Sequence, residues 1–89
     1  MNSYLTDDFR ACFALLPEEV KKQAQRNYQR WKKDPHHPGL RFKRVHPREP
    51  LYSVRVGQGW RAIGLREGDS ITWFWIGSHA DYETLLSRL

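Results

Sequence analysis

The N-terminal part of the chain repeats its apolar residues with the period of an α-helix. Phe9, Phe13 and Leu16 recur at i, i+4 and i+7, a spacing that places three apolar side chains on one side of a helix. Thr6 can accept a hydrogen bond at the start of this helix, and Pro17 ends it. The pattern therefore predicts a first helix that buries a single face.

A second apolar stripe follows the first. Val20, Ala24, Tyr28 and Trp31 lie at i, i+4, i+8 and i+11, and basic or polar residues fill most positions between them. This pattern predicts a second helix that runs to about Asp34, where a Pro-His-His-Pro-Gly segment cannot continue it. We expect the two helices to form a hairpin whose apolar stripes face each other and a sheet.

Beyond the hairpin the period changes to two, as in β-strands. The segment Leu40 to Val45 alternates apolar and basic residues, which predicts a first strand. Three further strands are expected where β-branched and aromatic residues are separated by glycine turns. These strands lie near residues 51–56, 60–65 and 70–76.

The C-terminal segment has the pattern of a short helix from His79 to about Arg88. Ser78 is placed to cap this helix, and Asp81 stands at the position of a capping-box acid. The expected fold class is α+β: an N-terminal helical hairpin packed on a four-stranded antiparallel sheet, with a short C-terminal helix. Because the 89 residues contain no linker and no internal repeat, we expect one domain over residues 1–89.

The hairpin of the second and third predicted strands brings two arginines together. A three-residue loop, Gly57–Gly59, sets Arg55 directly opposite Arg61. Like charges opposite each other destabilise an antiparallel pair, and an anion or a nearby carboxylate would offset that cost. In the alternative arrangement, both guanidiniums extend into water or pair with Glu67 or Glu83.

Positive charge is concentrated in the middle of the chain. The formal net charge is +5, but residues 21–66 hold thirteen Lys and Arg against two acidic residues, a net charge of +11. Residues 1–20 and residues 67–89 each carry a net charge of −3. A block of this kind is typical of a surface for a nucleic acid or an acidic protein, although any single cation can be an ordinary solvated residue.

Several kinds of chemistry are excluded by composition. Cys12 is the only cysteine, so the chain has no disulfide framework and no cysteine-based metal site. His36, His37 and His46 lack acidic or cysteine companions at ligand spacing, so we expect no metal ion and no other cofactor. No apolar run approaches the roughly 20 residues of a membrane span, and there is no signal peptide, which favours the reducing cytoplasm.

The order of the motifs resembles one known family. A basic helical hairpin is followed by Leu-Arg-Phe-Lys, Tyr-Ser-Val-Arg-Val-Gly, Trp-Arg-Ala-Ile-Gly and Ile-Gly-Ser-His-Ala-Asp-Tyr. From about Phe9 to Leu86 the chain resembles the RelE/ParE superfamily of bacterial toxins from type II toxin–antitoxin systems. The resemblance implies two helices on an antiparallel sheet, neutralisation by a cognate antitoxin, and one of two targets. RelE-like members cleave mRNA in the ribosomal A site without metal, whereas ParE-like members poison DNA gyrase.

The resemblance also assigns roles to single residues. Arg61 matches the arginine that contacts the scissile phosphate in RelE-like members. His79 and Tyr82 fall where some members have a C-terminal His and Tyr in acid or stacking roles, so the candidate catalytic residues are these three. The candidate RNA-binding residues are all basic and lie in the central block: Lys33, Arg41, Lys43 and Arg55.

One part of the family pattern is almost absent from this chain. Members usually begin with a strand before the first helix, and only Asn2 to Leu5 are left for it here. We therefore expect this edge strand to be missing or very short.

The candidate residues fit RNA cleavage through the 2′-hydroxyl, which requires a base, an acid for the leaving 5′-oxygen, and cations for the charge of the phosphorane. Imidazole, the side chain of His79, is the commonest general acid–base group in proteins, and Arg61 offers planar donors to phosphate. The structural alternatives are a helix-start role for His79 and a core role for Tyr82. The tryptophans of the sheet can stack on bases, but on a sheet this small they are more typical of a core: Trp60, Trp73 and Trp75.

Two functions from different classes are thus expected. The first is a ribosome-dependent mRNA endonuclease that blocks translation, and the basic face favours it. The second is a toxin that acts by binding alone, either on gyrase or as a non-catalytic member, and the absence of an obvious acid–base pair keeps it open. Under the first function the partners are mRNA on the ribosome and a cognate acidic antitoxin.

Overall fold

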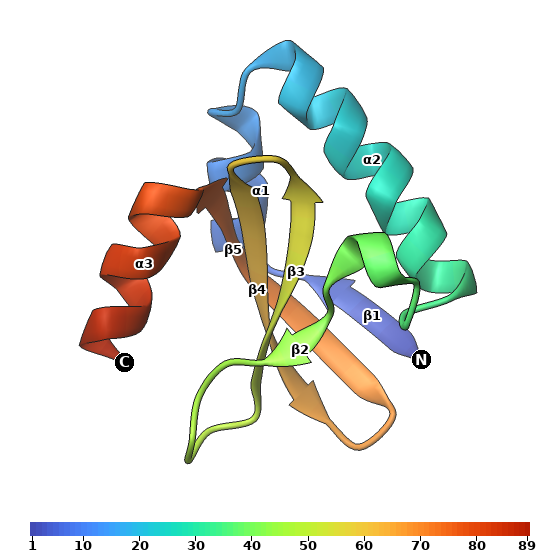
Figure 1. Cartoon of the computed structure of the whole chain (residues 1–89), viewed down its shortest axis with the longest axis vertical. Coiled ribbons are helices and arrows are strands. Elements are labelled where there is room, and N and C mark those ends of the chain that lie inside the picture. The colour runs from blue at the N-terminus through green and yellow to red at the C-terminus, as the bar shows by residue number, and fades with distance from the viewer.

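A computed structural model describes the whole chain, residues 1–89, as one sheet with three helices and a short 3₁₀ turn (Figure 1). The first elements are β1 (Asn2–Leu5), α1 (Asp7–Ala14), α2 (Glu18–Lys33), the 3₁₀ turn η1 (Pro38–Leu40) and β2 (Lys43–Arg44). The later elements are β3 (Leu51–Gly57), β4 (Trp60–Glu67), β5 (Ser70–Ser78) and α3 (His79–Arg88). The α+β class expected from the sequence is confirmed. No helix combines the length and the apolar composition that crossing a membrane requires.

The helix starts follow the predicted capping residues. Thr6 Oγ1 accepts a hydrogen bond from the Phe9 N–H (3.0 Å) at the start of α1. Ser78 Oγ accepts one from the Asp81 N–H (3.2 Å) at the start of α3. Each bond satisfies a backbone donor that a helix leaves free in its first turn. Short local signals therefore set where α1 and α3 begin.

The sheet has five strands in the order β1-β5-β4-β3-β2, and it is mixed. Strands β2 to β5 pair antiparallel, whereas β1 pairs parallel with β5, from Asn2 opposite Ser70 to Leu5 opposite Trp73. The prediction of a four-stranded antiparallel sheet is corrected by this fifth strand. β1 is present and only four residues long, which agrees with the expected very short edge strand.

Strand β2 is shorter than the predicted strand over Leu40 to Val45. Leu40 instead ends η1, where its N–H donates to the carbonyl of His37 (3.0 Å). Arg41 then adopts a left-handed conformation with φ of 48°, which turns the chain and delays strand pairing until Lys43. The predicted alternation survives this change, because Leu40 is buried while Arg41 and Lys43 are exposed.

The β3–β4 hairpin has the register predicted from its glycines. Arg55 pairs with Arg61, and a bulge follows before Gly57 pairs with Trp60. Gly59 in the turn has φ of 84°, a conformation that favours glycine. Two like charges therefore stand directly opposite each other in adjacent strands, at the end of the sheet next to the start of α3.

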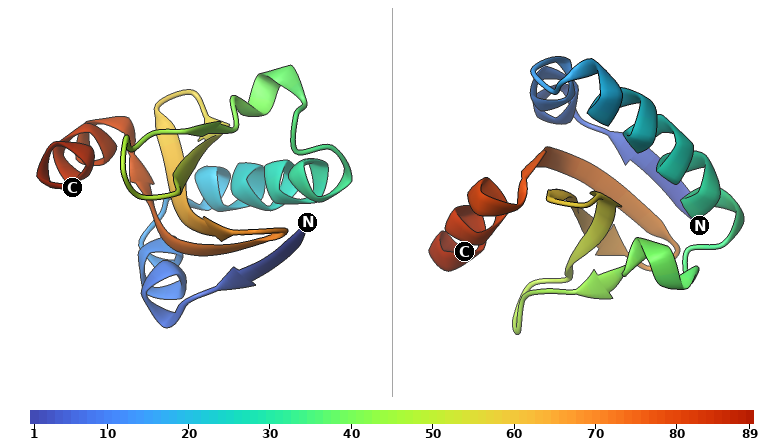
Figure 2. Two further views of the ribbon diagram at one scale, coloured as in Figure 1. Left: turned by 90° about the horizontal axis from the view of Figure 1, so that it is seen from below. Right: turned by 45° about the horizontal axis from the view of Figure 1, so that its top comes forward.

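Separate apolar clusters cover the two faces of the sheet. The larger cluster joins α1 and α2 to one face, and the Trp31 ring meets the Trp73 ring edge-on with centroids 5.5 Å apart. The smaller cluster joins α3 to the other face. Helices α2 and α3 consequently lie on opposite sides of the sheet (Figure 2). The buried members of the smaller cluster are Leu51, Ile63 and Tyr82.

Candidate functional site

A depression of about 380 Å³ opens on the face of the sheet that carries α3. Its walls come from the β2 region, β3, β4 and α3, and we call it the basic depression. Three of the ten lining residues are apolar, and cations outnumber acids. The lining residues are Arg41, Lys43, Arg44, Val45, Ser53, Arg61, His79, Tyr82, Glu83 and Leu86.

Arg61 extends from β4 into the basic depression and is half-buried. Its Nη1 donates to the carbonyls of Trp60 (2.8 Å) and Gly57 (3.3 Å). These two bonds hold the guanidinium in place against the hairpin turn. Its Nε and Nη2 donate to no protein group, so they are free to bind an anion in the planar geometry that suits phosphate.

The electrostatic environment of Arg61 also favours an anion. Burial lowers the pKa of the Arg61 guanidinium, and the neighbouring charge of Arg55 lowers this pKa further. Tyr82 raises the same pKa, Arg41 lowers it, and Glu83 raises it. The guanidinium is nevertheless protonated at neutral pH. A phosphate bound here would compensate a cation that is both desolvated and close to other cations.

His79 is the first residue of α3 and stands at the rim of the basic depression. Its backbone N–H donates to the carbonyl of Gly59 (2.7 Å), which ties the helix start to the β3–β4 turn that also holds Arg61. Its side chain is 46% exposed, and Nε2 lies 3.3 Å from Oε1 of Glu83. An exposed pair of this kind adds little stability, but it orients the imidazole and leaves it accessible.

Tyr82 occupies a core position, which the sequence analysis gave as the alternative to a catalytic role. It also lines the basic depression. Its ring is 6% exposed and packs in the smaller apolar cluster. Its hydroxyl donates to Oγ of Ser53 (3.2 Å), which is itself 2% exposed. The centroids of the Tyr82 and His79 rings are 5.7 Å apart. Tyr82 therefore joins α3 to β3 beside the imidazole.

The far end of α3 is anchored as well. His46 Nδ1 accepts hydrogen bonds from the backbone N–H groups of Arg48 (3.1 Å) and Glu49 (2.9 Å). Because Nδ1 is an acceptor, Nε2 carries the proton and donates to the carbonyl of Leu89 (3.0 Å). The loop between β2 and β3 thus holds the C-terminal end of the helix whose other end carries His79.

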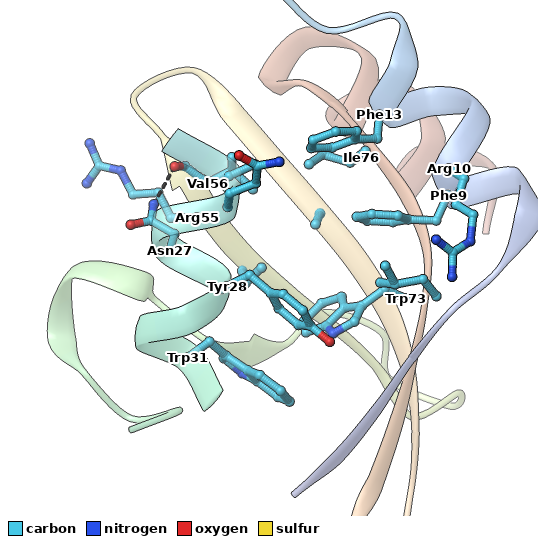
Figure 3. Close-up of a pocket in the computed structure, with 15 residues that line it drawn as sticks. Phe9, Arg10, Phe13, Asn27, Tyr28, Trp31, Arg55, Val56, Trp73 and Ile76 are labelled. Atoms are coloured by element: carbon cyan, nitrogen blue, oxygen red, sulfur yellow. Dashed lines mark hydrogen bonds between the residues drawn. The ribbon is translucent and has the colours of Figure 1, made fainter. Parts of the chain in front are cut away.

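The four candidate RNA-binding residues do not all lie in the basic depression. Arg41 and Lys43 line the basic depression. Arg55 is opposite Arg61 in the sheet, but it borders a different cavity, and its guanidinium is turned outward (Figure 3). Lys33 is at the end of α2 and does not line the basic depression. Neither Glu67 nor Glu83 pairs with an arginine. Glu67 forms no salt bridge, and the only salt bridge of Glu83 is with His79.

The second cavity is an apolar cleft between α1, α2 and the sheet, with a volume of about 400 Å³ (Figure 3). Phe9 and Phe13 of α1 face Tyr28 and Trp31 of α2 across it, above a floor that includes Trp73. The cleft contains two cations, Arg10 and Arg55, and no acidic residue. Apart from the two arginines, its only titratable side chain is that of Tyr28, whose hydroxyl is hydrogen-bonded to Oγ of Ser3.

The three tryptophans of the sheet pack in the core, as the sequence analysis expected for a sheet this small. Trp73 is buried in the larger cluster, where it contacts the rings of Trp31 and Phe42. Trp60 is partly buried against the same cluster, and Trp75 against the smaller one. None of the three lines the basic depression, so base stacking there would fall to other side chains.

Sequence reasoning did not include three polar residues of the basic depression among the candidates. Glu83 is four residues after His79, a spacing that places both on one face of a helix and could have identified it. Ser53 is two residues before Arg55 on the same strand, so period two places both on one face. Arg44 donates to loop carbonyls of His46 (3.1 Å) and Arg48 (3.3 Å), contacts with no recognisable sequence signal.

Comparison with known structures identifies the fold. A chain of the RelB–RelE antitoxin–toxin complex from Methanococcus jannaschii matches with a TM-score of 0.74 at 14% identity, over 92% of this chain and 96% of that one. YafQ from E. coli matches with a TM-score of 0.72 at 10% identity, over 91% and 96%. The isolated E. coli RelE toxin matches with a TM-score of 0.63 at 13% identity, over 99% and 98%. At these identities the likeness shows a shared fold.

The sequence itself gives the family. No curated protein matches the chain. The family model of the ParE-like toxin domain, however, matches residues 18–84, from the start of α2 into α3. Because this match spans most of the chain, the protein belongs to the family of ParE-like toxin domains, within the RelE/ParE superfamily that its motifs resemble.

Proposed function

We propose that the protein is the toxin of a type II toxin–antitoxin pair and that it blocks translation by cleaving mRNA on the ribosome. The observation that carries the proposal is the convergence of Arg61, His79, Arg41 and Lys43 on one depression. The cations would hold the phosphate backbone, and the imidazole would exchange a proton beside it. An accessible basic hollow with a titratable group at its rim suits a nucleic-acid substrate.

The proposed reaction uses the 2′-hydroxyl of the RNA as the nucleophile. The 2′-oxygen attacks the adjacent phosphorus, the bond from phosphorus to the 5′-oxygen breaks, and a 2′,3′-cyclic phosphate and a 5′-hydroxyl result. Arg61 binds the phosphate through Nε and Nη2 and stabilises the additional charge of the phosphorane. His79 transfers a proton at the reacting oxygens, with Glu83 orienting its ring.

The proposed dependence on the ribosome follows from how few acid–base groups the depression offers. His79 is its only imidazole, and the hydroxyl of Tyr82 already donates to Ser53. A site with so few such groups gains most of its rate from the orientation of its substrate. We therefore assign Tyr82 a positioning role and expect the ribosome to supply the orientation of the mRNA.

The experiment incubates the purified protein with one mRNA, with and without translating ribosomes, and maps the cleavage sites. Cleavage that requires ribosomes and yields 5′-hydroxyl ends supports the proposal. His79→Ala is the informative variant, since His79 is exposed and belongs to neither apolar cluster. Equal cleavage of naked and translated mRNA would contradict the ribosome dependence, and intact mRNA in both reactions would contradict the enzyme.

Inhibition of DNA gyrase by binding is the second candidate function. The observation in its favour is that the matching family model describes ParE-like toxin domains. Under this alternative the protein inhibits gyrase-dependent supercoiling of plasmid DNA while translated mRNA stays intact. His79→Ala would then leave the inhibition unchanged, whereas under the first proposal it abolishes mRNA cleavage.

A cognate antitoxin is part of the same proposal. The +11 centre favours an acidic, partly disordered antitoxin segment that folds as it docks, covering Arg55 and Arg61 or displacing α3. Such a field accelerates association and is screened over roughly 10 Å at 0.1 M salt. Stopped-flow binding across a salt series checks this: association should slow markedly as salt rises, and dissociation should change less. An association rate indifferent to salt would contradict recruitment by these cations.

A further inference from the structure

The tip of the β3–β4 hairpin, residues 57–60, carries the backbone carbonyls that hold two of the candidate catalytic residues. Nη1 of Arg61 donates to two of these carbonyls, at 2.8 Å and 3.3 Å. The backbone N–H of His79 donates to a third, that of Gly59 (2.7 Å). The orientation of the hairpin tip therefore determines where Arg61 and His79 lie in the basic depression.

The side chain of Asn27 on α2 is hydrogen-bonded to the strand that leads into the hairpin tip. Its Nδ2 donates to the carbonyl of Val56 (Figure 3). The bulge leaves Val56 without a partner in β4, and β2 pairs only with Tyr52 and Ser53 of β3. Neither neighbouring strand pairs with Val56, so the amide of Asn27 holds a part of β3 that the sheet itself does not hold.

Gly57 makes the hairpin tip depend on this bond. The residue has no Cβ, so its backbone dihedral angles are less restricted than those of other residues. A Cβ would lie 2.4 Å from Oε1 of Gln23 and 2.7 Å from its Cδ, so α2 covers this glycine closely. The Val56 carbonyl belongs to the planar peptide unit that enters Gly57, and the bond from Asn27 fixes that unit. The next carbonyl along the chain, that of Gly57, accepts from Arg61.

The packing of α2 on the sheet is supplied by other side chains. Val20, Ala24 and Trp31 are the buried residues of the helix, and all three belong to the larger apolar cluster. Asn27 is the only residue of α2 whose side chain hydrogen-bonds to the backbone of the sheet. Asparagine is also a poorer helix former than alanine in a helix interior. Its amide therefore contributes direction at the hairpin tip more than it contributes to the helix.

We propose that Asn27 is a positioning residue for the cleavage of RNA. By fixing the Val56 carbonyl it orients the Gly57 carbonyl, which holds the guanidinium of Arg61 so that Nε and Nη2 are free for the phosphate. The inference rests on the proposed ribosome-dependent cleavage and adds a residue from the opposite side of the sheet. Asn27 acts only through Arg61, because it lines the apolar cleft and not the basic depression.

The test compares Asn27→Ala with Tyr28→Phe. The hydroxyl of Tyr28 is hydrogen-bonded to Oγ of Ser3 on β1, so the control removes a different bond between α2 and the sheet, away from the hairpin tip. Cleavage is measured with saturating translating ribosomes, at a temperature at which circular dichroism shows both variants to be folded. Asn27→Ala should lower kcat on the order of tenfold and change KM little, because a misplaced Arg61 loses contact with the transition state. Tyr28→Phe should cleave at close to the wild-type rate.

A double-mutant cycle separates positioning of Arg61 from a general loss of stability. Arg61→Lys keeps the charge and removes the guanidinium that the hairpin tip holds. In the Arg61→Lys background, Asn27→Ala should therefore change the cleavage rate less than about twofold, since the two residues act as one unit. A variant that only weakens the fold would lower the rate by the same factor in both backgrounds.

Nitrogen NMR of the Arg61 side chain supplies a readout that does not depend on activity. Asn27→Ala should speed rotation of the guanidinium about the Nε–Cζ bond, and Tyr28→Phe should not. Unchanged rotation in Asn27→Ala, or equal factors in the two backgrounds of the cycle, would overturn the inference while the proposed function stands. If wild type leaves translated mRNA intact, the proposed function itself fails and the inference fails with it.

Discussion

The apolar cleft and the basic depression have nearly the same volume, about 400 Å³ and about 380 Å³, and opposite chemistry. Eleven of the fifteen residues that line the apolar cleft are hydrophobic, compared with three of ten in the basic depression. The walls of the cleft are also the core that holds α1 and α2 to the sheet. The walls of the depression are mostly polar side chains whose removal exposes little apolar surface. Substitutions in the cleft should therefore change stability, and substitutions in the depression should change activity.

Trp31→Ala should have the largest effect on the apolar side. Trp31 is 1% exposed and contacts the rings of Tyr28, Phe42 and Trp73. Deleting a buried aromatic ring leaves a cavity and costs about 3–5 kcal/mol of unfolding free energy. Urea unfolding followed by circular dichroism measures this loss. Such a loss is a large fraction of the stability of a domain of this size.

The matched control is Trp31→Phe. The Nε1–H group of Trp31 is buried and has no hydrogen-bond partner, so phenylalanine removes an unsatisfied donor and keeps a ring. Its cost should be well below that of alanine. Equal losses for the two variants would mean that ring packing does not determine stability at this position.

Arg61→Ala should have the largest effect on the basic side. The change removes a cation beside the proposed scissile phosphate and no atom of either apolar cluster. Loss of one preorganised donor to a developing charge typically lowers the rate about 10²- to 10³-fold. Growth arrest on expression should disappear while the melting temperature stays within a few degrees of wild type. The control is Arg66→Ala, because Arg66 is on the same strand but outside the depression. Growth arrest that persists in a folded Arg61→Ala protein would remove Arg61 from the mechanism.

Gly64→Ala should have an intermediate effect, confined to stability. A Cβ at Gly64 would lie 2.8 Å from Cε3 of Trp73 and 2.9 Å from Cγ1 of Ile71, both in the core. Overpacking of this kind costs about 1–3 kcal/mol. Gly39→Ala is the control, since its Cβ would approach only the His37 ring, no closer than 3.4 Å. Thermal unfolding of both proteins checks the difference, and a Gly64→Ala protein as stable as wild type would show that the Trp73 ring has room to move.

How much of the fold the sequence predicted depends on how local each feature is. The β3–β4 hairpin and the caps at Thr6 and Ser78 depend on residues close together in the chain, so local pattern was sufficient. The β1–β5 pairing was missed because Asn2 to Leu5 has no clear alternation and its partner strand lies near the other end of the chain. The length of β2 was overestimated because a left-handed Arg41, rare for any residue except glycine, cannot be recognised from alternation.

The candidate site was predictable to a similar extent. The family resemblance named Arg61 and His79, and the structure brings both to one depression. Lys33 was grouped with them by charge alone, although it lies at the end of α2 and does not line the basic depression. Glu83, the partner of His79, was missed although its four-residue spacing places both side chains on one face of α3.

Tyr82→Phe should have the smallest effect, and it tests the boundary between the two regions. Tyr82 belongs to the smaller apolar cluster and also lines the basic depression. The substitution keeps the ring and removes the hydrogen bond to Ser53 Oγ (3.2 Å), so the unfolding free energy should fall by about 0.5–1.5 kcal/mol. If Tyr82 only positions α3, cleavage at low temperature should fall less than about tenfold, and Ser53→Ala should produce a similar loss, because it breaks the same bond. A drop of 10²-fold or more in Tyr82→Phe alone, with Ser53→Ala close to wild type, would instead place the Tyr82 hydroxyl in the proton-transfer step.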